Sequence, residues 1–137
     1  MKKIFLATMV AALLSACCSS RSAQSARRSI VGEWTVEWIE GFENVAVEGE
    51  GTPAVTFESD KYYSYTGCNR LSGSLRLDGQ NIRFGDGPMT KMACNDRGRE
   101  QKFMEAIFAA DNFAFDGDAL LLRSGQKTVM RLAAKSK

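Results

Sequence analysis

Histidine is absent from this sequence of 137 residues. Without an imidazole, the chain lacks the commonest general base, the commonest metal ligand and the base of Ser-His-Asp triads. We therefore expect a protein that is not an enzyme, with no catalytic residue, no resident metal and no cofactor.

An excess of charge of one sign is also missing. The chain has 18 basic and 16 acidic residues, and Lys2 and Lys3 lie in a segment that we expect to be removed, which leaves the two signs balanced. Arg21, Arg27 and Arg28 precede the part that we expect to fold, so the domain lacks a basic surface of the kind that binds nucleic acid. Nucleic acid is therefore not an expected partner.

The third absence is a hydrophobic run long enough to cross a bilayer. Residues 4–14 form a run of eleven apolar or small residues, whereas a membrane-spanning helix needs about 20. The run follows Lys2 and Lys3, which is the arrangement of a secretory signal peptide, and we assign residues 1–16 to such a signal.

The signal ends in Leu14, Ser15, Ala16 and Cys17, a pattern that resembles the lipobox of bacterial lipoproteins. Small residues before the cysteine suit the signal protease, and the thiol of Cys17 can accept a diacylglyceryl group. We predict lipidation of Cys17 and anchoring to a membrane of the cell envelope, on the periplasmic side of the outer membrane in a Gram-negative organism. An ordinary secretory signal followed by a chance cysteine is the alternative.

Residues 17–29 are polar and small, and we interpret them as a tether between the lipid and the domain. Cys18 is left over in this tether. It is idle, further acylated or paired with another chain, and the sequence does not choose among these.

Residues 30–134 alternate short β-like runs with turn signals. This pattern predicts one α+β domain, a compact, mostly antiparallel, barrel-like sheet with one amphipathic helix. Hydrophobic residues make up 45% of the sequence, enough for a core. Trp34, Val36 and Trp38 alternate along the first strand, so we expect all three to face that core.

Turn signals divide the rest of the domain. Residues 41–52 are rich in glycine and acid and predict a loop, while residues 54–58 and 62–65 predict paired strands. Asp78-Gly79 and Asp116-Gly117 each predict a hairpin turn, and Gly125-Gln126 predicts the last turn, before a strand at residues 129–132.

Residues 97–110 predict the single helix. Phe103, Met104, Ile107 and Phe108 fall on one stripe at helical spacing, which indicates a face packed on the sheet. Asp96 precedes this segment in the position of an N-cap.

Two cysteines remain in the domain, Cys68 and Cys94. Export would place both in an oxidising compartment, which favours a disulfide between them. Such a bridge closes a loop of about 27 residues and would stabilise the fold by roughly 3.5 kcal/mol on the chain-entropy model.

Several short motifs, taken together and in order, resemble the META/HslJ domain family over residues 30–134. They are Gly67-Cys68-Asn69, the small residues 71–74, residues 82–85, Met92-Ala93-Cys94, the helical residues 100–107 and residues 119–122. Residues 88–91 depart mildly from the small residue, threonine and arginine that the family commonly places before the Met-Ala-Cys motif.

The resemblance implies a small β-rich envelope domain, loosely linked to heat-shock or antibiotic stress and to secretion or virulence, with no established enzymatic chemistry. It gives no catalytic residue to carry over. Gly67 and Asn69 are expected to serve the turn before Cys68, because glycine takes positive φ freely and asparagine can bond its own backbone. Met92 belongs to the same structural motif.

The expected function is that of a non-catalytic envelope lipoprotein that supports stress tolerance or binds another envelope component, with contacts from residues 41–52 or from Tyr62, Tyr63 and Tyr65. A protease-inhibitor-like module with a projecting loop is one alternative. A soft-metal site for Cu(I), built from Met89, Met92, Cys94 and Cys68, is a second. A hydrolase with paired carboxylates would use Asp86, Asp96 or Glu100.

Overall fold

Eight antiparallel strands close into a barrel in this computed structural model, which describes residues 28–43, 45–47 and 50–135. Each strand pairs with its neighbours along the chain, and the last strand returns to the first. The elements are β1 (Gly32–Ile39), β2 (Ala54–Phe57), β3 (Lys61–Tyr65), β4 (Arg70–Asp78), β5 (Asn81–Phe84), α2 (Arg99–Ala109), β6 (Asn112–Asp116), β7 (Ala119–Ser124) and β8 (Lys127–Ala134). The predicted α+β, barrel-like class is confirmed.

The strands bury alternate side chains, as the pleat of a β-strand requires. On β3, Tyr62 and Ser64 point inward and are buried, while Tyr63 between them is exposed. The hydroxyl of Tyr62 donates a hydrogen bond to the carbonyl of Gly85 at 3.0 Å. Burial, together with the nearby carboxylate of Asp86, raises the pKa of Tyr62 to about 12. The expectation that Tyr62 offers contact surface is therefore wrong, because its ring belongs to the core.

A β-bulge in β1 changes which tryptophan is buried. The pairing of β1 with β8 shifts between Val36 and Trp38, so one extra residue lies on the β1 side. Trp34 and Val36 remain inside the barrel, whereas Trp38 is 37% exposed and Ile39 takes the next inward position. The prediction that Trp38 faces the core is wrong because the bulge reverses the alternation beyond it.

The three predicted hairpin turns all form, each with a loop of two residues whose first member is a glycine. Asp78 pairs with Asn81, and Asp116 pairs with Ala119, so each aspartate is the last strand residue rather than the first loop residue. Gly79 then adopts φ 59°, in the left-handed region that two-residue hairpins need at their first loop position.

The helix α2 begins at Arg99, two residues later than the sequence predicted. The N-cap residue is Gly98, so the prediction that Asp96 occupies this position is wrong. Asp96 still caps the helix end from two residues earlier, since its two carboxylate oxygens accept hydrogen bonds from the backbone N–H groups of Gly98 (3.0 Å) and Glu100 (2.9 Å). The two residues between Asp96 and the helix, Arg97 and Gly98, both have positive φ, so helical geometry cannot start earlier.

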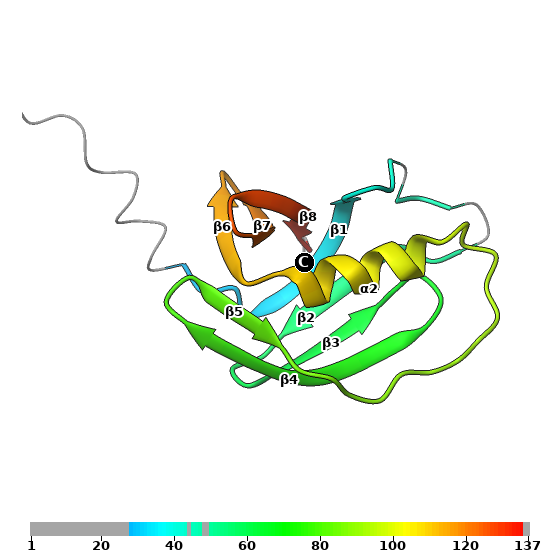
Figure 1. Ribbon diagram of the computed structural model, residues 1–137, viewed down its shortest axis with the longest axis horizontal. Helices are drawn as coiled ribbons and strands as arrows, with labels where there is room; N and C mark the ends of the chain where they lie inside the picture. Colours follow the sequence, from blue (N-terminus) through cyan, green and yellow to red (C-terminus); the bar gives the residue numbers. More distant parts are fainter. Residues whose placement is uncertain (1–27, 44, 48–49, 136–137) are drawn as a thin grey trace, which may run out of the picture.

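Figure 1 shows α2 lying across the barrel, and it packs against β1, β5, β7 and β8. Phe103 and Ile107 of the predicted stripe are fully buried in the core. Met104 is half-buried and Phe108 is 41% exposed, so the packed stripe is narrower than predicted. Among the described residues, no helix is long and apolar enough to span a membrane.

Candidate functional site

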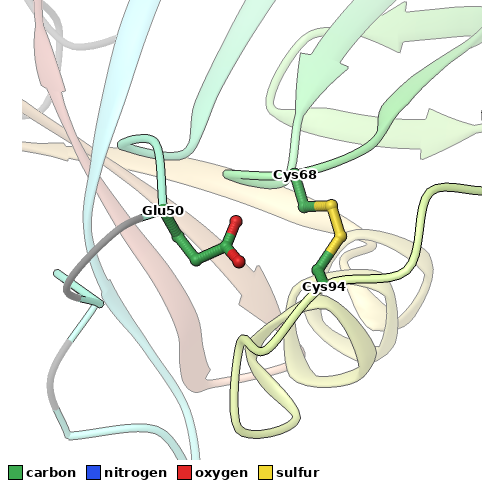
Figure 2. Close-up of side chains that lie close together, drawn as sticks. All are labelled: Glu50, Cys68 and Cys94. Atoms are coloured by element: carbon green, nitrogen blue, oxygen red, sulfur yellow. A yellow bond between two sulfur atoms is a disulfide. The ribbon is translucent and has the colours of Figure 1, made fainter.

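A disulfide ties together two segments at one end of the barrel. Cys68 lies in the turn between β3 and β4, and Cys94 lies in the segment before α2, with Cα atoms 6.2 Å apart (Figure 2). Both residues are half-buried. This is the pair that the sequence favoured, and it joins positions 26 residues apart.

Asn69 ties the same two segments a second time. Its side chain is 2% exposed, and its Oδ1 accepts hydrogen bonds from the Thr90 hydroxyl (2.8 Å) and the Met92 N–H (2.7 Å). Its Nδ2 donates to the Met92 carbonyl and to Glu100 Oε1, both at 3.2 Å. Asn69 is therefore a buried cross-link between the turn, the following loop and the helix.

The turn itself is closed by Thr66. Its Oγ1 accepts a hydrogen bond from the Asn69 N–H at 2.9 Å, and its own N–H donates to the Asn69 carbonyl at 2.9 Å. The Thr66 hydroxyl in turn donates to Glu100 Oε2 at 2.6 Å. The expected role of Asn69, bonding its own backbone in the turn, thus belongs to Thr66.

Gly67 adopts φ 96° and lies in a tight space, as the turn prediction implied. A Cβ atom there would lie 1.9 Å from Nη2 of Arg99 and 2.6 Å from the carbonyl oxygen of Gly51. Arg99 is fully buried, and its Nη1 donates to the Val45 carbonyl at 2.8 Å. The absence of a side chain at Gly67 therefore allows this guanidinium to lie against the turn.

We predict that Gly67→Ala lowers the free energy of unfolding by roughly 3 kcal/mol, because the alanine is strained at positive φ and also overlaps the Arg99 side chain. Gly98→Ala is the matched control, since Gly98 has φ 85° with no atom within 4 Å of an added Cβ. That variant should lose only about 1 kcal/mol. Urea unfolding of the two variants measures the difference, and equal losses would show that the overlap is unimportant.

Three side chains with potential metal-ligand atoms lie close together in the same region. Among the described residues, the side chains of Glu50, Cys68 and Cys94 have ligand atoms within 4.8 Å of one another (Figure 2). The two sulfur atoms share a disulfide bond, so neither is a thiolate that could bind a metal. One Glu50 oxygen accepts a hydrogen bond from the backbone N–H of Asn95.

The methionines proposed as soft ligands do not complete such a site. Met92 is 64% exposed and contributes to the region through its backbone groups, while Met89 is half-buried and packs against the core. With the disulfide formed, the copper hypothesis therefore lacks its thiolate donors.

The carboxylates that a hydrolase would need are engaged in the fold. Asp96 caps α2 with both oxygens, and Glu100 accepts hydrogen bonds from Thr66 and Asn69. Asp86 is exposed in the loop after β5. Asp96 and Glu100 therefore hold the structure together, whereas Asp86 does not.

A hollow of ≈ 510 Å³ lies on the outer face of β2, β3 and β4. We call it the tyrosine groove, and its lining includes Tyr63, Tyr65, Arg70, Ser72 and Thr56. Tyr63 lies between Thr56 and Ser72 on the neighbouring strands. Both neighbours are small, and Tyr63 is 45% exposed.

The polar end of the tyrosine groove is Arg70. Its guanidinium lies 5.5 Å from the centre of the Tyr65 ring, and no carboxylate of the described residues is paired with it within 4 Å. Tyr65 also donates from its hydroxyl to the Gly67 carbonyl at 2.9 Å, which fixes the ring against the turn. The groove thus combines two aromatic rings with an unpaired cation.

The predicted lipidation residue Cys17, together with Cys18 and the signal, lies outside the described residues. The region around Cys68 also contains four residues that the sequence did not assign to it: Thr66, Glu100, Arg99 and Glu50. A threonine before a glycine and a glutamate in the first turn of a helix are common in many proteins, so no local signal distinguishes them.

Fold and site together define a small antiparallel β-barrel, crossed by one helix and stapled by a single disulfide within the described residues. The chain belongs to the META domain family, whose family model matches residues 28–137. Among curated proteins, none matches this sequence.

A solved structure supports the same fold. The chain is similar to a protein from Burkholderia xenovorans with a structure determined by NMR, at 16% identity and a TM-score of 0.58, over 97% of this chain and 100% of that one. At this level of identity the likeness concerns the fold alone.

Proposed function

We propose that this META domain protein is a non-catalytic lipoprotein of the cell envelope that binds another envelope component through the tyrosine groove and so supports tolerance of envelope stress. The observation that carries the binding role is the groove itself, with two tyrosines and an unpaired Arg70 on one outer face. Tyrosine and arginine are enriched where proteins bind partners, because they combine apolar contact area with hydrogen bonding.

The lipid anchor is supported by the sequence before the domain. Leu14, Ser15 and Ala16 precede Cys17 in a lipobox-like pattern, and a multiply acylated terminus binds membranes stably. Mass spectrometry of the intact protein from membranes tests this part. A mass that corresponds to Cys17 onward plus acyl chains supports the anchor, and an unmodified terminus contradicts it.

The binding role is tested in cells by placing a photo-crosslinking amino acid at position 63. We expect one specific envelope component to be crosslinked from this position, and none from position 38, where Trp38 is also aromatic and is 37% exposed but lies on β1 outside the groove. Equal crosslinking patterns from the two positions would contradict a role for the groove.

Tyr63→Ala is the matching functional prediction. Because Tyr63 is largely exposed, its loss should leave the fold intact and weaken binding of the crosslinked component by about 2 kcal/mol, roughly 30-fold. Trp38→Ala should leave binding unchanged. Titration of the purified component against both variants, with circular dichroism to check folding, measures this.

A further inference from the structure

The junction between β5 and β6 has the fewest register pairs of any in the barrel. A single register pair, Asn81 with Asn112, joins the two strands, with backbone hydrogen bonds from Ile82 to Asp111 and from Phe113 to Gln80. A hollow of ≈ 1070 Å³ lies over this junction. We call it the seam groove, and it is separate from the tyrosine groove.

Two arginines of the seam groove stand directly opposite each other. Arg76 on β4 is the register partner of Arg83 on β5, and both are exposed. Like charges at opposed positions of an antiparallel pair repel each other and destabilise the sheet. Neither guanidinium has a carboxylate within 4 Å among the described residues, although the field of Arg83 reaches Asp111. An oxyanion between the two would relieve this repulsion.

The rest of the seam groove is mixed in character. It includes a third arginine, Arg123, the amides of Gln80 and Asn81, and the side chain of Leu77, which is 36% exposed. Arg123 uses Nη2 to donate to the Gln126 carbonyl at 2.6 Å. The cations are thus accompanied by neutral hydrogen-bonding groups and by an apolar surface.

Two carboxylates, Asp78 and Asp111, also line the groove against its three arginines. Asp111 accepts hydrogen bonds from the Asn112 amide (2.6 Å) and from the backbone N–H of Gly125 (3.0 and 3.3 Å). These bonds lower the pKa of Asp111, so it stays charged, and they hold its oxygens at the β7–β8 turn. This leaves Arg76 and Arg83 as the cations without a close partner.

We propose that the seam groove binds a sugar that carries an oxyanion, a phosphate or a carboxylate, with the anion held between Arg76 and Arg83. Guanidinium groups form paired hydrogen bonds with both kinds of oxyanion. The amide of Asn81, which lies on the same face of the β4–β5 hairpin as the two arginines, and the amide of Gln80 in the adjoining turn offer hydrogen bonds to ring hydroxyls. This site is distinct from the tyrosine groove, so the fate of one proposal does not decide the other.

Glucose 1-phosphate is a suitable probe for the purified full chain. We expect it to raise the melting temperature of the wild type and to shift NMR signals of residues around the β4–β5 hairpin. In Arg83→Gln, binding should weaken at least tenfold, while the variant without ligand should melt at the same or a higher temperature, because the repulsion is gone. Arg97→Gln is the matched control, since it removes one exposed arginine that lines neither groove and should bind as the wild type does.

Several outcomes would overturn the proposal. An equal rise in melting temperature with sodium chloride at the same ionic strength would indicate charge screening only. Undiminished binding to Arg83→Gln would remove the arginine pair from the site. Binding of inorganic phosphate as tight as that of glucose 1-phosphate would contradict a role for the sugar. Retention of the wild type on phosphatidylglycerol vesicles, lost in Arg83→Gln, would assign the site to a lipid phosphate instead.

Discussion

Replacement of Asn69 by alanine is expected to lower the free energy of unfolding by about 3–5 kcal/mol. The side chain makes four hydrogen bonds to Thr90, Met92 and Glu100 while being 2% exposed. Removal would leave several buried partners without a hydrogen bond, and each such loss costs more than a net hydrogen bond contributes. Chemical denaturation followed by tryptophan fluorescence measures the effect.

Two further variants make this prediction specific. Asn95→Ala, in the same segment but exposed, should change stability by no more than about 0.5 kcal/mol. Asn69→Asp keeps the acceptor oxygens but sets a carboxylate against Glu100, so its deficit relative to the wild type should narrow as the pH falls from about 7 to about 4 and carboxylates become protonated. A loss in Asn69→Ala no larger than in Asn95→Ala would show that the network does not stabilise the fold.

Loss of the disulfide is expected to have the second largest effect. In the double variant Cys68→Ser/Cys94→Ser, the free energy of unfolding should fall by roughly 3.5 kcal/mol, because the unfolded chain regains the entropy of a loop of 26 residues. The domain should still unfold in one cooperative step, since Asn69 continues to hold the same two segments together. Denaturation of the oxidised wild type and of the variant gives the comparison.

Reduction supplies the control for this variant. A thiol reductant should destabilise the wild type by a similar amount and leave the serine variant unchanged. Asn69 and the disulfide join the same segments. When Asn69→Ala is combined with the two serine substitutions, the loss in free energy of unfolding should therefore differ from the sum of the two separate losses. If the reductant left the free energy of unfolding of the wild type unchanged, this result would contradict a stabilising role for the disulfide.

The strand β4 links both proposed binding regions to this scaffold. Its first half contributes Arg70 and Ser72 to the tyrosine groove, and its second half contributes Arg76 and Asp78 to the seam groove. The disulfide lies two residues before β4 begins, and the hydroxyl of Thr90 accepts a hydrogen bond from the Arg70 N–H at 2.9 Å. The end of the barrel that contains the disulfide therefore holds β4 in place, and β4 contributes residues to both grooves.

The elements that the sequence predicted well depend on interactions between near neighbours. Alternation of apolar residues on either side of Gly79, Gly117 and Gly125 predicted three hairpins, and all three form. The helix was found from its 3.6-residue spacing, although it begins two residues later. In each case the signal and the structure lie within about ten residues, so local propensity and periodicity are sufficient.

The sequence by itself determined the fold class, the turns, the helix and the family, because these follow from short-range patterns and from motifs in order. Only the tertiary structure decided that Trp38 faces outward, since the bulge that moves it arises from pairing with β8. It also decided that Asn69 meets Glu100, because that contact depends on how the turn before β4 and the helix come together. The pairing of Arg76 with Arg83, by contrast, follows from the local hairpin in which Asp78 pairs with Asn81. The seam groove itself lies where Asn81 meets Asn112, a long-range pairing that no local pattern encodes.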